Sequence, residues 1–186
     1  MAILKIARMG HPVLLQRAEP VADPTSAETR QLVADMMETM EDANGAGLAA
    51  PQVHVLLRLF VFRVNAERAS GDPLDRPMGN TVVINPTLEL IEGDDRLRWE
   101  GCLSIPGLRA AVPRAWSVRY TGVDTDNNPV GGTVTGFHAG VVQHEYDHLD
   151  GIMYPMRMQD FSLFGFNEEL ARAAALQTAV QTVAPR

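Results

Sequence analysis

The sequence is poor in cysteine, in basic residues and in long apolar runs, and each shortage excludes a class of protein. Cys102 is the one cysteine among 186 residues, so the chain forms no internal disulfide and nothing points to an oxidising compartment. Lys and Arg number 16 against 23 Asp and Glu, and the net charge of −7 disfavours nucleic acids and anionic membranes as partners. No apolar run approaches the ~18 residues of a membrane span, and residues 1–12 lack the apolar core of a signal peptide. We therefore expect a soluble cytoplasmic protein with no membrane contact and no direct DNA binding.

The balance of residue types is that of one globular domain. Hydrophobic residues make up 46% of the chain and charged residues 21%. No internal repeat or low-complexity tract divides the sequence, so we expect a single domain over residues 1–186. Glycine, proline and aspartate gather in residues 66–80, which are expected to form a surface loop.

Three segments predict helices. Thr25 and Glu28 match a capping box, and apolar residues recur at helical spacing through residues 26–44. The second predicted helix covers residues 136–149. The third covers residues 162–183 at the C-terminal end.

Short runs rich in Val, Ile, Leu and aromatic residues predict strands between turn residues. These runs are residues 53–64, 81–84, 88–91 and 116–123. Few long helices among many short strands indicate an α+β fold rather than alternating βαβ units.

The segment HEYDH, residues 144–148, is the most informative part of the sequence. On a helix His144 and His148 lie one turn apart on the same face, where both imidazoles can bind one metal ion with Glu145 beside them. The composition predicts roughly 0.008 such patterns by chance. The plain alternative is a surface helix that happens to carry two histidines and several carboxylates.

Catalytic metal sites usually take three protein ligands, so two histidines need a third residue. Glu168 lies in the last predicted helix and would make a thermolysin-like HExxH endopeptidase. Cys102 lies upstream of the histidines and would supply a thiolate instead. A lone cysteine that packs as a small hydrophobic residue is the commonest alternative. At this point both ligand sets remain open.

Three ordered segments together resemble the peptide deformylase family: GAGLAAPQ at residues 45–52, EGCLS at 100–104 and HEYDH at 144–148. The resemblance extends from the HPVL segment near the N-terminus to residues 150–151. It implies antiparallel sheets around a central metal-ligand helix, with an N-terminal and a C-terminal helix. The metal ligands that it implies are Cys102, His144 and His148. The native ion is then Fe(II), which Zn, Ni or Co can replace, and Glu168 has no role.

By this resemblance the chain removes the formyl group from the N-terminal formylmethionine of newly synthesised polypeptides and releases formate. A bound divalent ion lowers the pKa of water to about 7. Glu145 is then the general base and acid. The side-chain amide of Gln52 and the backbone N–H of Leu103 are expected to stabilise the negative charge that develops on the formyl oxygen.

The resemblance and helix geometry also imply how the substrate binds. Its backbone is expected to contact a glycine-rich strand and one further glycine: Gly45, Ala46, Gly47 and Gly101. Gly140 and Val141 share the helix face of His144, with Phe137 one turn earlier, so they are expected to line the methionine pocket. Glycine in mid-helix costs about 0.5–1 kcal/mol relative to alanine, and we expect Gly140 to enlarge that pocket in compensation.

Two further expectations concern charge. Glu100 and Arg114 are expected to form an ion pair beside the site. The last predicted helix lacks the basic face that docking on ribosomal RNA would need, so the sequence does not argue for the transient ribosome contact that the function would allow.

Three functions therefore compete. They are a deformylase, an HExxH endopeptidase that uses Glu168 as its third ligand, and an inactive peptide-binding module that holds a metal. The last is the weakest, because a general base and all the candidate ligands are present.

Overall fold

The computed structural model describes residues 2–173, apart from the side chains of Glu92 and Asp94. Within that range six strands form one sheet in the order β1-β2-β3-β4-β5, and β6 pairs with β4. The strands are β1 (Gly47–Ala49), β2 (Leu59–Val64), β3 (Met78–Cys102), β4 (Ile105–Val123), β5 (Pro129–Thr135) and β6 (Phe164–Phe166). All pairings in the sheet are antiparallel. The α+β class is confirmed.

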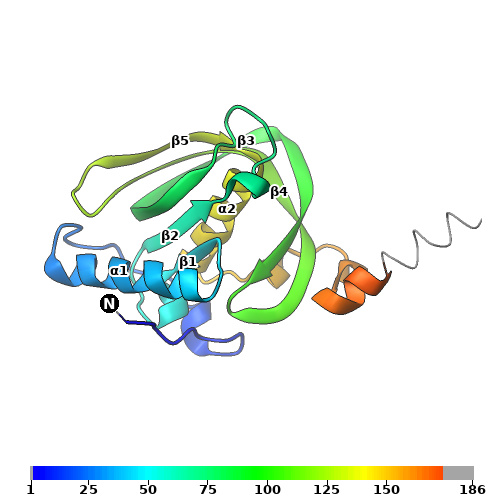
Figure 1. The fold of residues 1–186 in the computed structure, drawn as a ribbon, viewed down its shortest axis with the longest axis horizontal. Helices are drawn as coiled ribbons and strands as arrows, with labels where there is room; N and C mark the ends of the chain where they lie inside the picture. The colour runs from blue at the N-terminus through cyan, green and yellow to red at the C-terminus, as the bar shows by residue number, and fades with distance from the viewer. Residues whose placement is uncertain (1, 174–186) are drawn as a thin grey trace, which may run out of the picture.

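Helix α2 (Gly136–Leu149) has the bounds that the sequence predicts and runs through the middle of the molecule with strands around it (Figure 1). A loop residue holds the start of this helix. Asp75 Oδ2 accepts the N–H of Phe137 at 2.9 Å, and its Oδ1 accepts the N–H of His138 at 3.0 Å. Residues 66–80, expected to be only a surface loop, thus supply the cap of the central helix, because these N–H groups have no partner inside it.

Helix α1 (Ala27–Asp42) also forms where the sequence predicts it, but Ser26 caps it rather than Thr25. The Ser26 hydroxyl accepts the N–H of Thr29 at 3.1 Å. Met36 and Met40 of this helix are fully buried in a cluster with residues of β1 and β2. No helix of the described chain is both long and apolar enough to cross a membrane.

The strands are longer than their apolar runs. The predicted runs 81–84 and 88–91 belong to one strand, β3, and the run 116–123 is the last part of β4. The rest of this hairpin was not predicted, because charged residues, glycines and prolines interrupt its apolar residues, although the backbones pair there. Strand β5 was missed because it contains Gly131 and Gly132, which favour turns.

Two other predicted elements have different bounds. The run 53–64 begins as a strand only at Leu59, since His54 has a positive φ of 66° and ends a short 3₁₀-helix. The helix predicted over 162–183 begins at residue 167, because residues of β6 pair with Leu108–Ala110 of β4 instead. Residues 174–183 of that prediction lie outside the described chain, so the single domain over the whole length stays a prediction.

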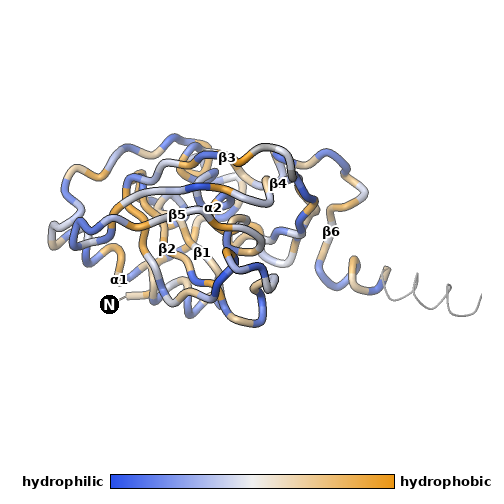
Figure 2. The backbone as a smooth tube through the Cα atoms, turned by 90° about the horizontal axis from the view of Figure 1, so that it is seen from above, coloured by the Kyte–Doolittle hydropathy of each residue, from blue (hydrophilic) through white to orange (hydrophobic). Residues whose placement is uncertain are grey.

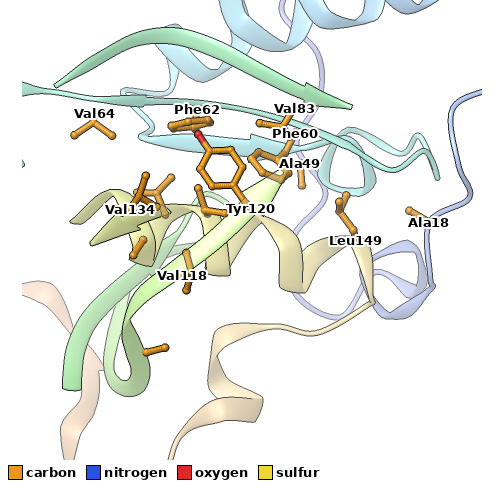
Figure 3. Close-up of a cluster of buried hydrophobic side chains, with 14 residues drawn as sticks. Ala18, Ala49, Phe60, Phe62, Val64, Val83, Val118, Tyr120, Val134 and Leu149 are labelled. Carbon is orange, nitrogen blue, oxygen red and sulfur yellow. The ribbon is translucent and has the colours of Figure 1, made fainter. Parts of the chain in front are cut away.

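Buried side chains of β2 and β4 pack against α2. Phe62 and Tyr120 meet edge to face with ring centroids 6.3 Å apart, and Leu149 of α2 belongs to the same cluster (Figure 3). The apolar stretches of β1 and β2 lie inside the body of the molecule, while residues 167–173 extend from its far end (Figure 2). The core thus fixes α2 relative to the ends of the strands, where the site lies.

Candidate active site

Cys102 and two histidines bring their ligand atoms together. Cys102 ends β3, and His144 and His148 lie one turn apart on α2. Their sulfur and nitrogen atoms all lie within 4.8 Å of one another, and the sulfur is 3.3 Å from His148 Nε2. In the described part of the chain no other group of three such residues is found. One thiolate and two imidazoles form a donor set that suits a divalent transition metal.

The surroundings of Cys102 favour its thiolate. Burial raises the pKa of the thiol, but His148 and His144 outweigh burial and hold this pKa well below its usual range. The backbone N–H of Ser104 also donates to the sulfur at 3.4 Å. The thiolate is the form of cysteine that binds metal.

Glu100 fixes the orientation of His144. Its Oε2 lies 2.8 Å from His144 Nδ1, which leaves Nε2 of that ring for a metal. Arg114 donates to both oxygens of Glu100, at 2.7 and 3.0 Å, so the expected ion pair is confirmed. Burial would raise the pKa of Glu100, yet the hydrogen bonds from His144 and Arg114 lower it to about 2.

The same arginine links the strand to the ligand helix. Arg114 Nη1 donates to Asp147 Oδ2 at 2.6 Å, and Arg157 donates to Asp147 Oδ1 at 2.6 Å. Tyr154 stacks on His144 with ring centroids 6.1 Å apart. Sequence reasoning missed Asp147, Tyr154 and Arg157, although Asp147 lies inside the HEYDH segment and could have been noticed there.

Glu145 is 4% exposed and lies beside the ligands. Its Oε2 has no hydrogen-bond partner among the described residues. Burial raises the pKa of this carboxyl group to about 7, although His144 and His148 oppose the shift. A Cβ atom added to Gly47 would collide with the Glu145 carboxylate, so the strand can approach the helix this closely only at a glycine.

Gln52 presents its amide to the same site. Its Oε1 accepts the N–H of Ala49 at 2.8 Å, which fixes the orientation of the amide. Its Nε2 donates to Ser104 Oγ at 3.1 Å and lies 3.4 Å from Cys102 Sγ. An N–H donor of this side chain therefore lies beside the candidate metal ligands.

A cleft of about 450 Å³ opens over the ligands. All of the predicted metal-ligand, catalytic and substrate-binding residues except His148 line it: Gly45, Ala46, Gly47, Gln52, Gly101, Cys102, Leu103, Phe137, Gly140, Val141, His144 and Glu145. His148 does not line the cleft because it is buried, with 1% of its surface exposed.

The structure corrects the expectation for Gly140. The guanidinium group of Arg98 occupies the place that a Cβ atom on Gly140 would take, so the glycine accommodates an arginine rather than leaving extra space for methionine. Sequence reasoning missed Arg98 and also Arg68, both of which line the cleft. Strand alternation could have found Arg98, because it lies two residues before Glu100 and on the same face of β3.

Glu168 does not reach the site. It is exposed on the helical segment 167–173 and is not part of the ligand group. Cys102 takes the third position, so the ligand set of the HExxH endopeptidase is not favoured.

Comparisons with known proteins agree with this geometry. The family model for polypeptide deformylase matches residues 3–163. Peptide deformylase 2 of Ralstonia nicotianae is 48% identical over 168 residues, which cover 90% of this chain and 94% of the relative. A crystal structure of peptide deformylase from Ehrlichia chaffeensis has a TM-score of 0.78 at 27% identity, and the match covers 99% of this chain and 98% of that one.

A Met-Ala-Ser-bound crystal structure of the class I type b peptide deformylase of Acinetobacter baumannii is also similar. Its TM-score is 0.74 at 34% identity, and the match covers 83% of this chain and 99% of that chain. The family match spans both the cysteine segment and the histidine helix that form the ligand group. The chain therefore belongs to the polypeptide deformylase family.

Proposed function

We propose that this chain removes the formyl group from the N-terminal formylmethionine of newly synthesised polypeptides, with Cys102, His144 and His148 as its metal ligands. The observation that carries the proposal is the approach of the Cys102 sulfur to the two histidines, within 4.8 Å. A thiolate in this position distinguishes the family from an HExxH endopeptidase that would use Glu168.

One divalent ion fits the site. The second ring nitrogen of His144 is engaged by Glu100, the buried Glu145 Oε2 has no partner among the described residues, and the Cys102 thiol favours its thiolate. When bound, the ion supplies Lewis acidity and lowers the pKa of water to about 7. We propose Fe(II) as the native ion, with Zn, Ni or Co as substitutes.

The residues around the ion have two separate roles, proton transfer and stabilisation of negative charge. Glu145 accepts a proton from the attacking water at its unpartnered oxygen and returns it to the leaving amine. The Gln52 amide and the Leu103 backbone N–H donate to the formyl oxygen as its negative charge grows. The Gln52 amide suits this role because Ala49 already fixes its orientation.

The substrate backbone binds along β1. This is an edge strand of the sheet, which pairs only with β2 among the described strands, so its free edge can accept an added strand. Gly45, Ala46 and Gly101 are proposed as further backbone partners. Phe137, Gly140 and Val141 lie along one face of α2 in the cleft and are proposed to contact the methionine side chain. The Met-Ala-Ser complex of the Acinetobacter baumannii relative supports a peptide that begins with methionine.

Two products distinguish the competing functions. Anaerobically purified protein is incubated with formyl-Met-Ala-Ser and with a longer unblocked peptide, and formate and internal fragments are measured. We expect formate and no internal fragments. Internal fragments without formate would contradict the proposal, and neither product would indicate a binding module.

Two substitutions make the same distinction at the ligands. Cys102→Ala is expected to abolish metal binding, measured by elemental analysis, because it removes a ligand atom. Glu168→Ala is the matched control and keeps the ion, since Glu168 is exposed away from the site. Loss of the ion in Glu168→Ala alone would favour the endopeptidase.

The identity of the ion has its own test. A ferrous ion and a thiolate are both open to oxidation, so activity of the iron form is expected to decay in air and to persist after Ni replaces the iron. Activity is measured over time in air and under anaerobic conditions. Equal decay of the iron and nickel forms would contradict an iron-dependent loss. Cytoplasmic location and transient contact with the ribosome stay predictions.

A further inference from the structure

The cleft continues beyond the metal ligands into a second hollow. That hollow, of about 170 Å³, shares five residues with the cleft: Asn44, Gly45, Ala46, Arg68 and Phe137. It adds Arg63 and Asn65, so its walls are mostly polar. A bound peptide that leaves the metal site in this direction meets arginine side chains.

Arg68 and Arg98 lie on the ring of Phe137. Their guanidinium carbons are 4.2 and 5.9 Å from the ring centroid. Arg98 also donates to the backbone oxygen of Gly136, which holds it against the start of α2. Both arginines line the cleft, so their remaining N–H donors are available to a ligand there.

Among the described side chains, neither Arg68 nor Arg98 forms an ion pair. The carboxylates near Arg98 have other partners, since Glu100 is bound by Arg114 and Asp75 accepts the N–H groups at the start of α2. Burial lowers the pKa of both guanidinium groups, although the charges of Glu100 and Asp75 oppose the shift at Arg98. In a chain of net charge −7, this is a local positive surface.

Strand geometry indicates which substrate residue reaches these arginines. In an extended peptide, side chains of residues one and three point to the same side and lie about 6.6–6.8 Å apart along the chain. The Arg98 guanidinium group covers Gly140, so the first side chain is placed at Val141. The third side chain then lies roughly one helical turn, or about 5.4 Å, further along α2. Phe137 lies one turn before Gly140 and Val141, on the side away from the two histidines of the site.

We propose that Arg68 and Arg98 form a subsite that selects aspartate or glutamate at the third residue of the formylated peptide. The proposal rests on the proposed function, because it takes the position of the first residue from it. A carboxylate there gains charge-assisted hydrogen bonds from two guanidinium groups. The second side chain points to the other side of the peptide, so acidity at that position brings no such gain.

The test compares the kcat/KM of formate release from two C-terminally amidated peptides, formyl-Met-Ala-Glu and formyl-Met-Ala-Gln. They differ only in the charge of the third side chain. We expect a preference for glutamate of about fivefold, the ratio that corresponds to one modest ion pair, and a smaller preference at high ionic strength. Formyl-Met-Glu-Ala and formyl-Met-Gln-Ala serve as the positional control and are expected to give a ratio near one.

The arginines are tested through the ratio of kcat/KM for the glutamate peptide to that for the glutamine peptide. A change that affects both peptides equally leaves this ratio unaltered. Arg68→Gln is expected to lower the ratio, and the double variant with Arg98→Gln to bring it to about one. Arg119→Gln, which removes an exposed positive charge on β4 outside the cleft, is expected to keep it. Arg68 is exposed, so Arg68→Gln is expected to fold even if the double variant does not, and the ratio can then be measured on Arg68→Gln alone.

Three results would overturn the inference. Formate release from both peptides without a preference for glutamate would remove the subsite and leave the proposed function in place. A preference that survives both arginine substitutions would remove these residues from it. No formate from either peptide would overturn the proposed function, and the subsite with it.

Discussion

At the scale of single residues, two glycines determine where charged side chains can lie in the site. Gly47 and Gly140 each leave room for a charged side chain, Glu145 in one case and Arg98 in the other. Both glycines were singled out from the sequence, but as contacts for substrate. Glu145 and Arg98 come from segments distant in the sequence. No local pattern could therefore have shown that their side chains occupy the space beside each glycine.

Gly47→Ala is expected to lower the kcat/KM of formate release by at least about 100-fold, because the new methyl group collides with the Glu145 carboxylate and displaces the general base. Metal content, measured in the same samples, is expected to stay unchanged. Gly79→Ala is the matched control, since an added Cβ there meets no atom within 4 Å. Equal activity of the two variants would show that Glu145 tolerates the displacement.

At the scale of secondary structure, α2 is the element that the sequence predicts best. Its bounds match the predicted range 136–149, and its ligand face follows from the spacing of the two histidines. The strands were predicted only in part, because pairing with a neighbour extends β3 and β4 through segments whose charged residues, glycines and prolines interrupt a strand pattern. The cap of α2 was missed because Asp75 lies 62 residues before Phe137.

Asp75→Ala is expected to lower the free energy of unfolding by at least about 2 kcal/mol. The substitution leaves the first N–H groups of α2 and that of Ser70 without their acceptor. Urea denaturation measures the loss. Asp72→Ala, in the same loop, removes a half-buried carboxylate that accepts the N–H of Leu74 at 2.8 Å, and it is expected to have a smaller effect. Equal losses would mean that Asp75 stabilises only its own loop.

At the scale of the whole molecule, the buried layer between sheet and helix includes a polar group that responds to pH. His138 is 3% exposed, lies 3.2 Å from the Tyr120 hydroxyl and packs on Phe62 with ring centroids 5.1 Å apart. Burial lowers the pKa of His138 from 6.5 to about 4, although the charge of Asp75 opposes the shift. The folded protein therefore binds this proton less readily than the unfolded chain.

Because the pKa is lower in the folded state, protonation of His138 favours the unfolded chain. Above pH 6.5 the histidine is neutral in both states and does not change the free energy of unfolding. As the pH falls from about 6.5 to about 4, its protonation lowers the free energy of unfolding. The full loss corresponds to about 3 kcal/mol. Urea denaturation across this range is expected to show a shallower pH dependence for His138→Gln than for the unchanged protein. His54→Asn, a substitution of an exposed histidine, is expected to keep the original slope. Parallel slopes for all three proteins would exclude His138 as the cause.

The division of the ligands between β3 and α2 has a consequence for biogenesis. The thiolate and the imidazoles are separated by about forty residues, which include all of β4 and β5. While the chain is being translated, it carries no complete chelating group until HEYDH has left the ribosome and docked beside the cysteine. Metallation is accordingly a late event, and a truncated product that stops before α2 cannot retain the ion in this way.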